Sequence, residues 1–132
     1  MSEWEDLNIL NKVEAILEQA SRESQVHHFG GPFLTAYQIA ISYAELYPED
    51  LERMEYDIGG KDTGVHYSLT QYLANQLSNR IDSREITNIE GRFISNRYVS
   101  NLIFDSGDIH VESSAMGNRA TISMFRLTNQ DR

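Results

Sequence analysis

The chain has 132 residues, of which 40% are hydrophobic and 23% charged, and this composition is typical of a folded globular protein rather than a disordered one. It contains no cysteine, which excludes disulfides, thiolate metal sites and cysteine nucleophiles. The net charge of −9 comes entirely from residues 1–60, because acidic and basic residues balance over positions 61–132. An acidic half repels nucleic acid and anionic membranes, so a surface for DNA or phosphate is expected only after residue 60.

The chain is predicted to form a single domain over residues 1–132. Within it, residues 1–31 form an N-terminal helix and connector, and residues 32–132 form a helical core followed by a C-terminal β-meander. The acidic start lacks the features of a secretory signal, and the longest apolar stretch, residues 33–47, is too short to span a bilayer. We therefore expect a cytoplasmic protein that does not bind membranes.

The first helix is predicted over about residues 3–23. Ser2 and Glu5 have the spacing of a capping box, and apolar residues then recur at helical intervals. Trp4, Ile9 and Ile16 lie along one edge of this apolar face. One interpretation is that these three residues form an exposed interface for a second copy of the chain or for a basic partner. The other is that the two isoleucines cover the β-sheet of the same monomer.

Three further helices are predicted in the middle of the chain, over about residues 33–47, 49–56 and 68–83. The first of them should be buried, because its few polar residues form one narrow stripe: Thr35, Gln38, Ser42 and Glu45. Pro48 ends that helix and starts the short acidic one. Ser68 and Gln71 form a capping box for the last.

The final third of the chain has the pattern of β-structure. Residues 86–94 are predicted as extended segments around Gly91, and residues 99–104, 109–113 and 120–127 as three strands. Turn-forming residues separate these strands at 105–108 and 116–118. The fold class is therefore expected to be α+β, with helices followed by a small antiparallel β-sheet over about residues 86–127.

This order of elements resembles that of winged-helix domains, in which a buried helix, a short helix and a polar-faced helix precede a β-hairpin. The resemblance covers residues 33–112, with one extra helix in front, and concerns element order rather than a signature motif. It implies DNA recognition by the 68–83 helix. The connection from Tyr56 to Ser68 departs from the pattern, since a helix-turn-helix uses a turn of three or four residues.

A DNA interface of this kind would use the polar face of the 68–83 helix. Amide side chains can pair with base edges, and basic side chains can hold phosphates. The residues available for these roles are Gln71, Asn75 and Asn79 for bases, and Lys61, Arg80, Arg84, Arg92 and Arg97 for phosphates. The alternative is that neutral polar residues simply cover an exposed helix, with Asp82 and Glu85 neutralising the arginines.

Two further features of the sequence bear on small binding sites: a glycine-rich loop and the positions of the histidines. The glycine-rich segment Gly59–Gly64 could bind an anion through its backbone N–H groups and Lys61, with His66 nearby, or it could be an ordinary connector. The histidines, His27, His28, His66 and His110, do not have the spacing of metal ligands, so no metal site is expected.

No pattern in the sequence specifies an enzyme. There is no Gly-x-Ser-x-Gly motif, and we expect neither catalytic residues nor a cofactor. The leading hypothesis is a small non-enzymatic interaction module that binds a protein partner or itself. The alternatives are the DNA-binding protein described above and, third, a small-ligand or anion-binding protein that uses the Gly59–Gly64 loop.

Overall fold

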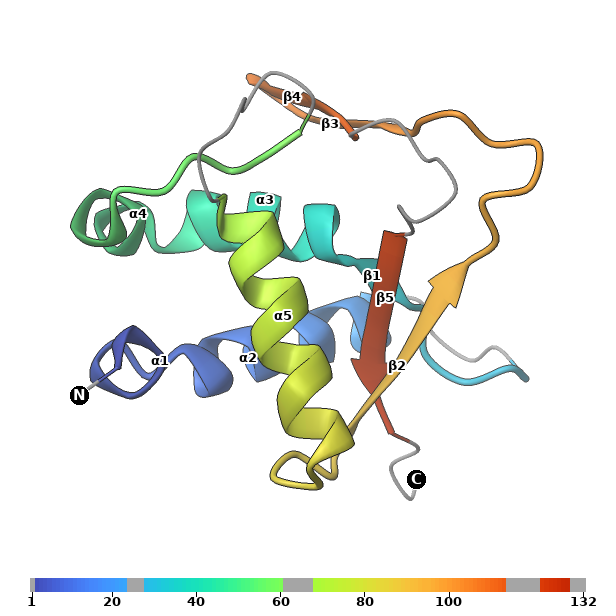
Figure 1. Cartoon of the computed structure of the whole chain (residues 1–132), viewed down its shortest axis with the longest axis horizontal. Coiled ribbons are helices and arrows are strands. Elements are labelled where there is room, and N and C mark those ends of the chain that lie inside the picture. Colours follow the sequence, from blue (N-terminus) through green and yellow to red (C-terminus); the bar gives the residue numbers. More distant parts are fainter. Residues whose placement is uncertain (1, 24–27, 61–67, 114–121, 129–132) are drawn as a thin grey trace.

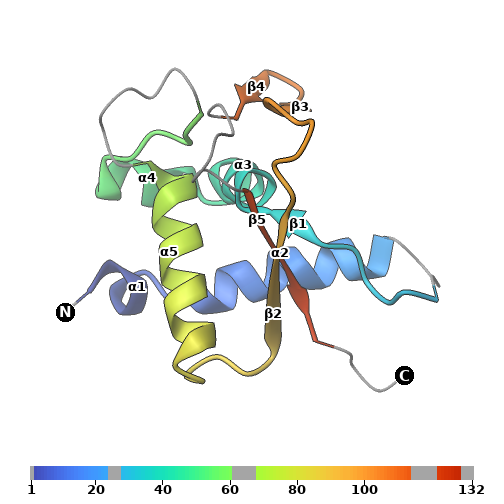
Figure 2. The same ribbon diagram turned by 45° about the vertical axis from the view of Figure 1, so that its right-hand side comes forward.

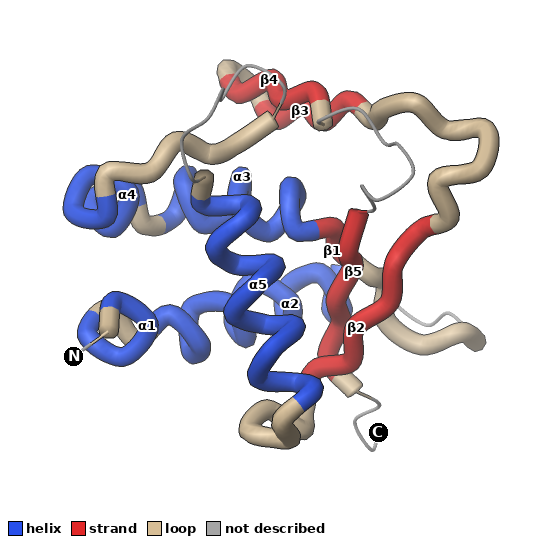
Figure 3. The backbone as a smooth tube through the Cα atoms, viewed as in Figure 1, coloured by secondary structure: helices blue, strands red, loops and turns tan. Residues whose placement is uncertain are grey.

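A computed structural model describes residues 2–23, 28–60, 68–113 and 122–128, and its fold is α+β, as the sequence predicts. Apart from the short strand β1, the helices come before the strands along the chain (Figures 1 and 3). The helices are α1 Glu3–Asp6, α2 Ile9–Glu23, α3 Ala36–Leu46, α4 Pro48–Met54 and α5 Leu69–Asp82. The strands are β1 Leu34–Thr35, β2 Ile89–Ile94, β3 Ile103–Ser106, β4 Ile109–Glu112 and β5 Ile122–Leu127.

The first predicted helix is interrupted after its first turn. Ser2 caps α1, accepting a hydrogen bond from the Glu5 backbone N–H, but α1 ends at Asp6, with Leu7 as its C-cap residue, and α2 begins at Ile9. Asn8 between them has a φ of 56°, in the left-handed region that asparagine tolerates better than most residues. At this break the chain changes direction between α1 and α2. The guanidinium of Arg80 on α5 lies over the Trp4 ring, with Cζ 4.6 Å from the centroid of the ring.

The core lies between α2, α3 and α5 on one side and the larger sheet on the other (Figure 2). Its fully buried side chains come from every one of these elements: Ile9, Val13 and Leu17 from α2, Ile39 and Tyr43 from α3, Leu69, Leu73 and Leu77 from α5, Ile89 from β2 and Phe125 from β5. Ala40 of α3 is also completely buried. The 33–47 helix is therefore central, although its first three predicted residues precede α3 and two of them, Leu34–Thr35, form β1.

The β-structure differs from the predicted meander. The larger sheet is antiparallel in the order β1-β5-β2, and the β3–β4 hairpin forms a separate two-stranded sheet. Phe125, 1% exposed at the centre of β5, pairs with Leu34 on one side and Gly91 on the other. A Cβ at Gly91 would lie 3.3 Å from the Phe125 ring, so the glycine makes room for that ring within a continuous strand β2. The most buried strand thus takes the centre of the sheet, whereas strands adjacent in sequence were expected to pair.

The β3–β4 hairpin lies over the outer face of α3 (Figures 1 and 2). Its turn contains Gly107 with a φ of 58°, where the sequence predicts a turn. The Phe104 ring stacks on Tyr37 of α3 with centroids 5.4 Å apart, and the Ser106 hydroxyl donates to Oε2 of Glu45. Strand β3 begins four residues later than predicted, at Ile103, and the predicted start of β5 and the 116–118 turn lie outside the described residues.

Within the described residues, no helix combines the length and apolar character needed to cross a membrane.

Candidate functional site

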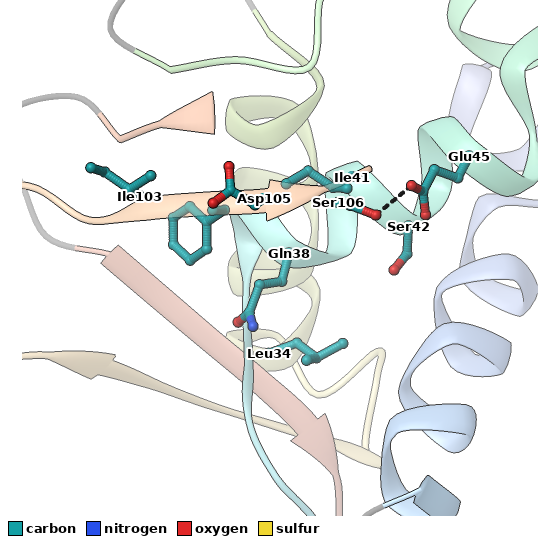
Figure 4. Close-up of a pocket in the computed structure, with 9 residues that line it drawn as sticks. Leu34, Gln38, Ile41, Ser42, Glu45, Ile103, Asp105 and Ser106 are labelled. Carbon is teal, nitrogen blue, oxygen red and sulfur yellow. Dashed lines mark hydrogen bonds between the residues drawn. The ribbon is translucent and has the colours of Figure 1, made fainter. Parts of the chain in front are cut away.

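An open groove of about 370 Å³ separates α3 from β3 (Figure 4). We call it the α3–β3 groove. It is lined by Leu34, Gln38, Ile41, Ser42 and Glu45 on one side and by Ile103, Phe104, Asp105 and Ser106 on the other. Both apolar and polar side chains therefore line one cavity, as they do in sites that bind organic groups.

The α3 wall of the groove is the polar stripe seen in the sequence. Thr35 is the N-cap residue of α3: its Oγ1 accepts a hydrogen bond from the Gln38 N–H (3.1 Å), and Gln38 Oε1 accepts one from the Thr35 N–H (2.8 Å). This reciprocal pair fixes the start of the helix and the position of Gln38. Ser42 and Glu45 follow at intervals of four and three residues, so they fall on the same face.

The β3 wall follows from the alternation of side chains along a strand. Phe104 and Ser106 face α3, where they contact Tyr37 and Glu45. Ile103 and Asp105 lie at the rim, and Ile103 is 69% exposed. The Asp105 carboxylate contacts Nδ1 of His110, its cross-strand neighbour on β4. The hairpin therefore presents one large apolar side chain and one carboxylate beside the groove.

The charge of the groove is negative. Among the described residues that line it, the ionisable ones are Glu45 and Asp105, and both are acidic. Glu45 also lies in the last turn of α3, where the helix dipole disfavours negative charge. In Figure 4 the two carboxylates lie on either side of Ile41 and Ser106. Such an arrangement can hold a cationic group that also has apolar parts.

The polar face of α5 is exposed as expected, but the cations predicted to accompany it are not gathered there. Gln71, Asn75 and Asn79 are all exposed on α5. Arg80, by contrast, packs on Trp4 and forms an ion pair with Glu85, so its guanidinium is engaged within the protein.

The other predicted phosphate ligands are dispersed. Arg92 pairs with Glu90 on β2 at 3.3 Å, and Arg97 donates to the Tyr98 hydroxyl at 3.3 Å on the connection that follows β2. Arg84 is exposed just after α5, and Lys61 lies outside the described residues. The described part of the chain therefore brings the three amide residues together on one helix, but assembles no basic cluster beside them.

The interface predicted on the first helix is corrected by the structure. Trp4, Ile9 and Ile16 are 5%, 0% and 4% exposed, because the apolar face of α2 packs on α3 and on β5. Side chains that are already buried in the monomer do not form an exposed patch. The second interpretation of the two isoleucines, that they cover the sheet of the same monomer, is the one that fits.

The start of the Gly59–Gly64 loop has a structural role. Backbone N–H groups of Leu69 and Thr70 donate to Asp57 and Ile58 carbonyls, and those of Gln71 and Tyr72 donate to Ser68. The first N–H groups of α5 therefore already have acceptors, which leaves an anion little to bind at this helix end. Lys61 and His66 lie outside the described residues, as does His27. Among the described residues, no three potential metal ligands gather.

A buried polar cluster that the sequence did not reveal joins α2, α3 and α4. Oδ2 of Asp50 accepts hydrogen bonds from Lys12 Nζ and from the Tyr43 hydroxyl, both at 2.7 Å. Burial and the adjacent Asp50 carboxylate raise the pKa of Tyr43. Asp50 belongs to the acidic run at the start of α4, and no local pattern distinguishes it from Glu49 or Glu52. The cluster is closed around its own members and serves the fold.

No family model, curated protein or solved structure matches the chain. Its function must therefore be argued from its own surfaces.

Proposed function

We propose that this protein is a small non-enzymatic interaction module of the cytoplasm, and that it binds a protein partner in the α3–β3 groove. The observation that carries the proposal is the composition of that groove, where Ile41, Ile103 and Phe104 lie beside two carboxylates. Protein interfaces combine an apolar centre with a polar rim, and the groove has both. The Ser106 hydroxyl of the lining donates to the Glu45 carboxylate, and we assign this contact to holding the two walls of the groove together rather than to catalysis.

The proposal can be tested by selecting peptides from a random library displayed on phage, with the wild-type protein immobilised. Selected peptides should bind the wild type but not Ser42→Trp, in which a large ring fills the groove. Ser78→Trp is the matched control, because it places the same ring on the exposed face of α5. Failure to enrich any peptide, or equal binding to both variants, would overturn the proposal.

A second candidate function is DNA binding in the manner of a winged-helix protein. The observation that favours it is the topology: α2, β1, α3, α5, β2 and β5 follow one another with a sheet in the order β1-β5-β2. Winged-helix domains have three helices and a three-stranded sheet in this order. In this chain α2 would then be the first of the three helices rather than an extra helix in front of them. On this proposal α4 belongs to an insertion before α5, and the connection between β2 and β5 is the wing.

Charge makes DNA binding the weaker of the two candidates. Non-specific affinity for DNA depends on basic residues that neutralise phosphates, and the net charge of this chain is −9. The test is fluorescence anisotropy with a labelled random-sequence duplex at about 50 and 150 mM salt. Binding that disappears in Gln71→Ala with Asn79→Ala, while both proteins remain folded, would replace the first proposal with this one. No binding at either salt concentration would exclude it for duplex DNA.

A further inference from the structure

We infer that the occupant of the α3–β3 groove is an arginine side chain, presented by an apolar segment of a basic partner protein. This inference rests on the proposed function and specifies the chemistry of the partner. It joins three features of the groove: its negative charge, its apolar walls and the position of Glu45 at the end of α3.

The negative charge of the groove indicates that the partner segment is positively charged. Glu45 and Asp105 are the charged residues of the groove, and residues 1–60, which include α3 and Glu45, carry the whole net charge of the protein. A second copy of this acidic chain would bring like charge to the groove, and so would a nucleic acid. A segment with positive charge is attracted at long range and neutralises the two carboxylates once it is bound.

The geometry of the acceptors favours arginine over lysine. Ser106 donates to Oε2 of Glu45, and His110 contacts Oδ1 of Asp105, so these contacts hold both carboxylates in place. Each carboxylate has two oxygens and several lone pairs, so it can accept further hydrogen bonds from a ligand. A planar guanidinium presents its five N–H donors in a fixed fork that matches the two oxygens of a carboxylate such as Glu45, whereas an ammonium acts as a single point.

The apolar lining suits the rest of such a side chain. The methylene stem of arginine packs along apolar surface while its charged end stays with polar groups. Ile41 and Phe104 line the groove for such a stem, and Ile103 is exposed at the rim, where it can contact an apolar neighbour in the partner. An arginine flanked by an apolar residue therefore matches the groove in both charge and surface.

The position of Glu45 is a separate sign that the groove has a use. A carboxylate in the last turn of a helix opposes the helix dipole, so among the described residues the hydrogen bond from Ser106 is the one contact that favours glutamate at this position in the folded protein. Residues that break a local rule of this kind are concentrated at functional sites. Replacing Glu45 with glutamine keeps the shape of the side chain and should leave the protein at least as stable, so a loss of binding cannot be attributed to unfolding.

The test uses the peptides selected with the wild-type protein and measures their affinity by isothermal titration calorimetry. We expect an arginine in the selected sequence whose replacement by citrulline, a neutral isostere, weakens binding at least tenfold and whose replacement by lysine weakens it less. Glu45→Gln should weaken the original peptide by a similar factor and should no longer distinguish arginine from citrulline. Glu52→Gln, an exposed glutamate of α4 outside the groove, is the matched control and should change nothing.

The outcomes separate this inference from the function on which it rests. Peptides that bind in the groove, as shown by their loss in Ser42→Trp, but tolerate citrulline would overturn the arginine inference and leave the interaction module standing. Selected peptides that bind Glu45→Gln as tightly as they bind the wild type would also overturn the arginine inference and leave the interaction module standing. Failure to select any groove-binding peptide would overturn both.

Discussion

At the scale of single residues, Tyr43 shows how burial of a hydroxyl, together with its hydrogen bond to the Asp50 carboxylate, makes stability depend on pH. Tyr43 is fully buried on α3, and its hydroxyl donates to Asp50 of α4. Its pKa is raised in the folded state, so above about pH 10, the ordinary tyrosine pKa, the unfolded chain loses this proton while the folded one keeps it. The free energy of unfolding should therefore fall by about 1.4 kcal/mol per pH unit from this group alone.

Tyr43→Phe tests this account. At neutral pH we expect a loss of about 1 kcal/mol, the usual net contribution of such a hydrogen bond, measured by urea unfolding. As the pH rises from about 9 to 11, the wild type should lose stability more steeply than the variant, so that the gap between them narrows. Lys12 is present in both proteins and serves as an internal control. Parallel curves for the two proteins would contradict the assignment.

Glu45→Gln gives a second prediction for a single residue, this time with the opposite sign. Removal of a carboxylate from the last turn of α3 should raise the free energy of unfolding by about 0.3–1 kcal/mol, less whatever its hydrogen bond from Ser106 contributes. Thermal unfolding at low ionic strength is the measurement, because salt screens the dipole effect. A clear fall in the melting temperature would show that Glu45 is retained for stability rather than for binding.

At the scale of elements, Gly60, in the segment that precedes α5, packs closely against strand β4 of the β3–β4 hairpin. Gly60 has a φ of 112°, and a Cβ there would lie 2.7 Å from the backbone oxygen of Glu112 on β4. Gly60→Ala should therefore cost about 1–3 kcal/mol through backbone strain, with the steric clash added to it. Gly107→Ala is the control, since its φ of 58° is also positive but nothing lies within 4 Å of the added carbon. Equal losses in urea unfolding would refute a close contact at Gly60.

The apolar face of α2 provides a second prediction at this scale. Ile16→Asp places a carboxylate in the core, and we expect a loss of several kcal/mol, comparable with the total stability of a small domain. Leu46→Asp, at an exposed position in the last turn of α3, should cost only about 1 kcal/mol, because a carboxylate there opposes the helix dipole. Circular dichroism should show Ile16→Asp unfolded and Leu46→Asp folded. A folded Ile16→Asp would return that residue to the surface and revive the idea of an interface on the first helix.

At the scale of the whole molecule, what the sequence could predict depended on how local the signal was. The α5 helix was predicted to within a residue, since Ser68 caps it and its apolar residues recur regularly. The break at Asn8 is not predicted by the sequence, because apolar residues continue to recur at helical spacing across it. The pairing of β1, β5 and β2 joins segments some 90 residues apart, such as Leu34 and Phe125, and no local pattern encodes such a register.

For the same reason, the sequence indicates only one of the two walls of the candidate site. The polar stripe of Gln38, Ser42 and Glu45 could be read from helical spacing, but its role could not, because the other wall comes from a strand more than fifty residues later. The burial of Ile9 and Ile16 likewise depends on the tertiary packing of α2 against β5. Exposure of an apolar face is a property of the assembled molecule, and amphipathic spacing alone does not determine it.

The most direct test of the central claim is to map a selected peptide onto the protein by NMR. Backbone amide shifts of the isotope-labelled wild type would be followed as the unlabelled peptide is added. We predict that the largest changes fall on Ser42, Glu45, Asp105 and Ser106, on both walls of the α3–β3 groove. Changes concentrated instead on Gln71, Asn75 and Asn79 of α5 would contradict the claim and place the binding surface on that helix.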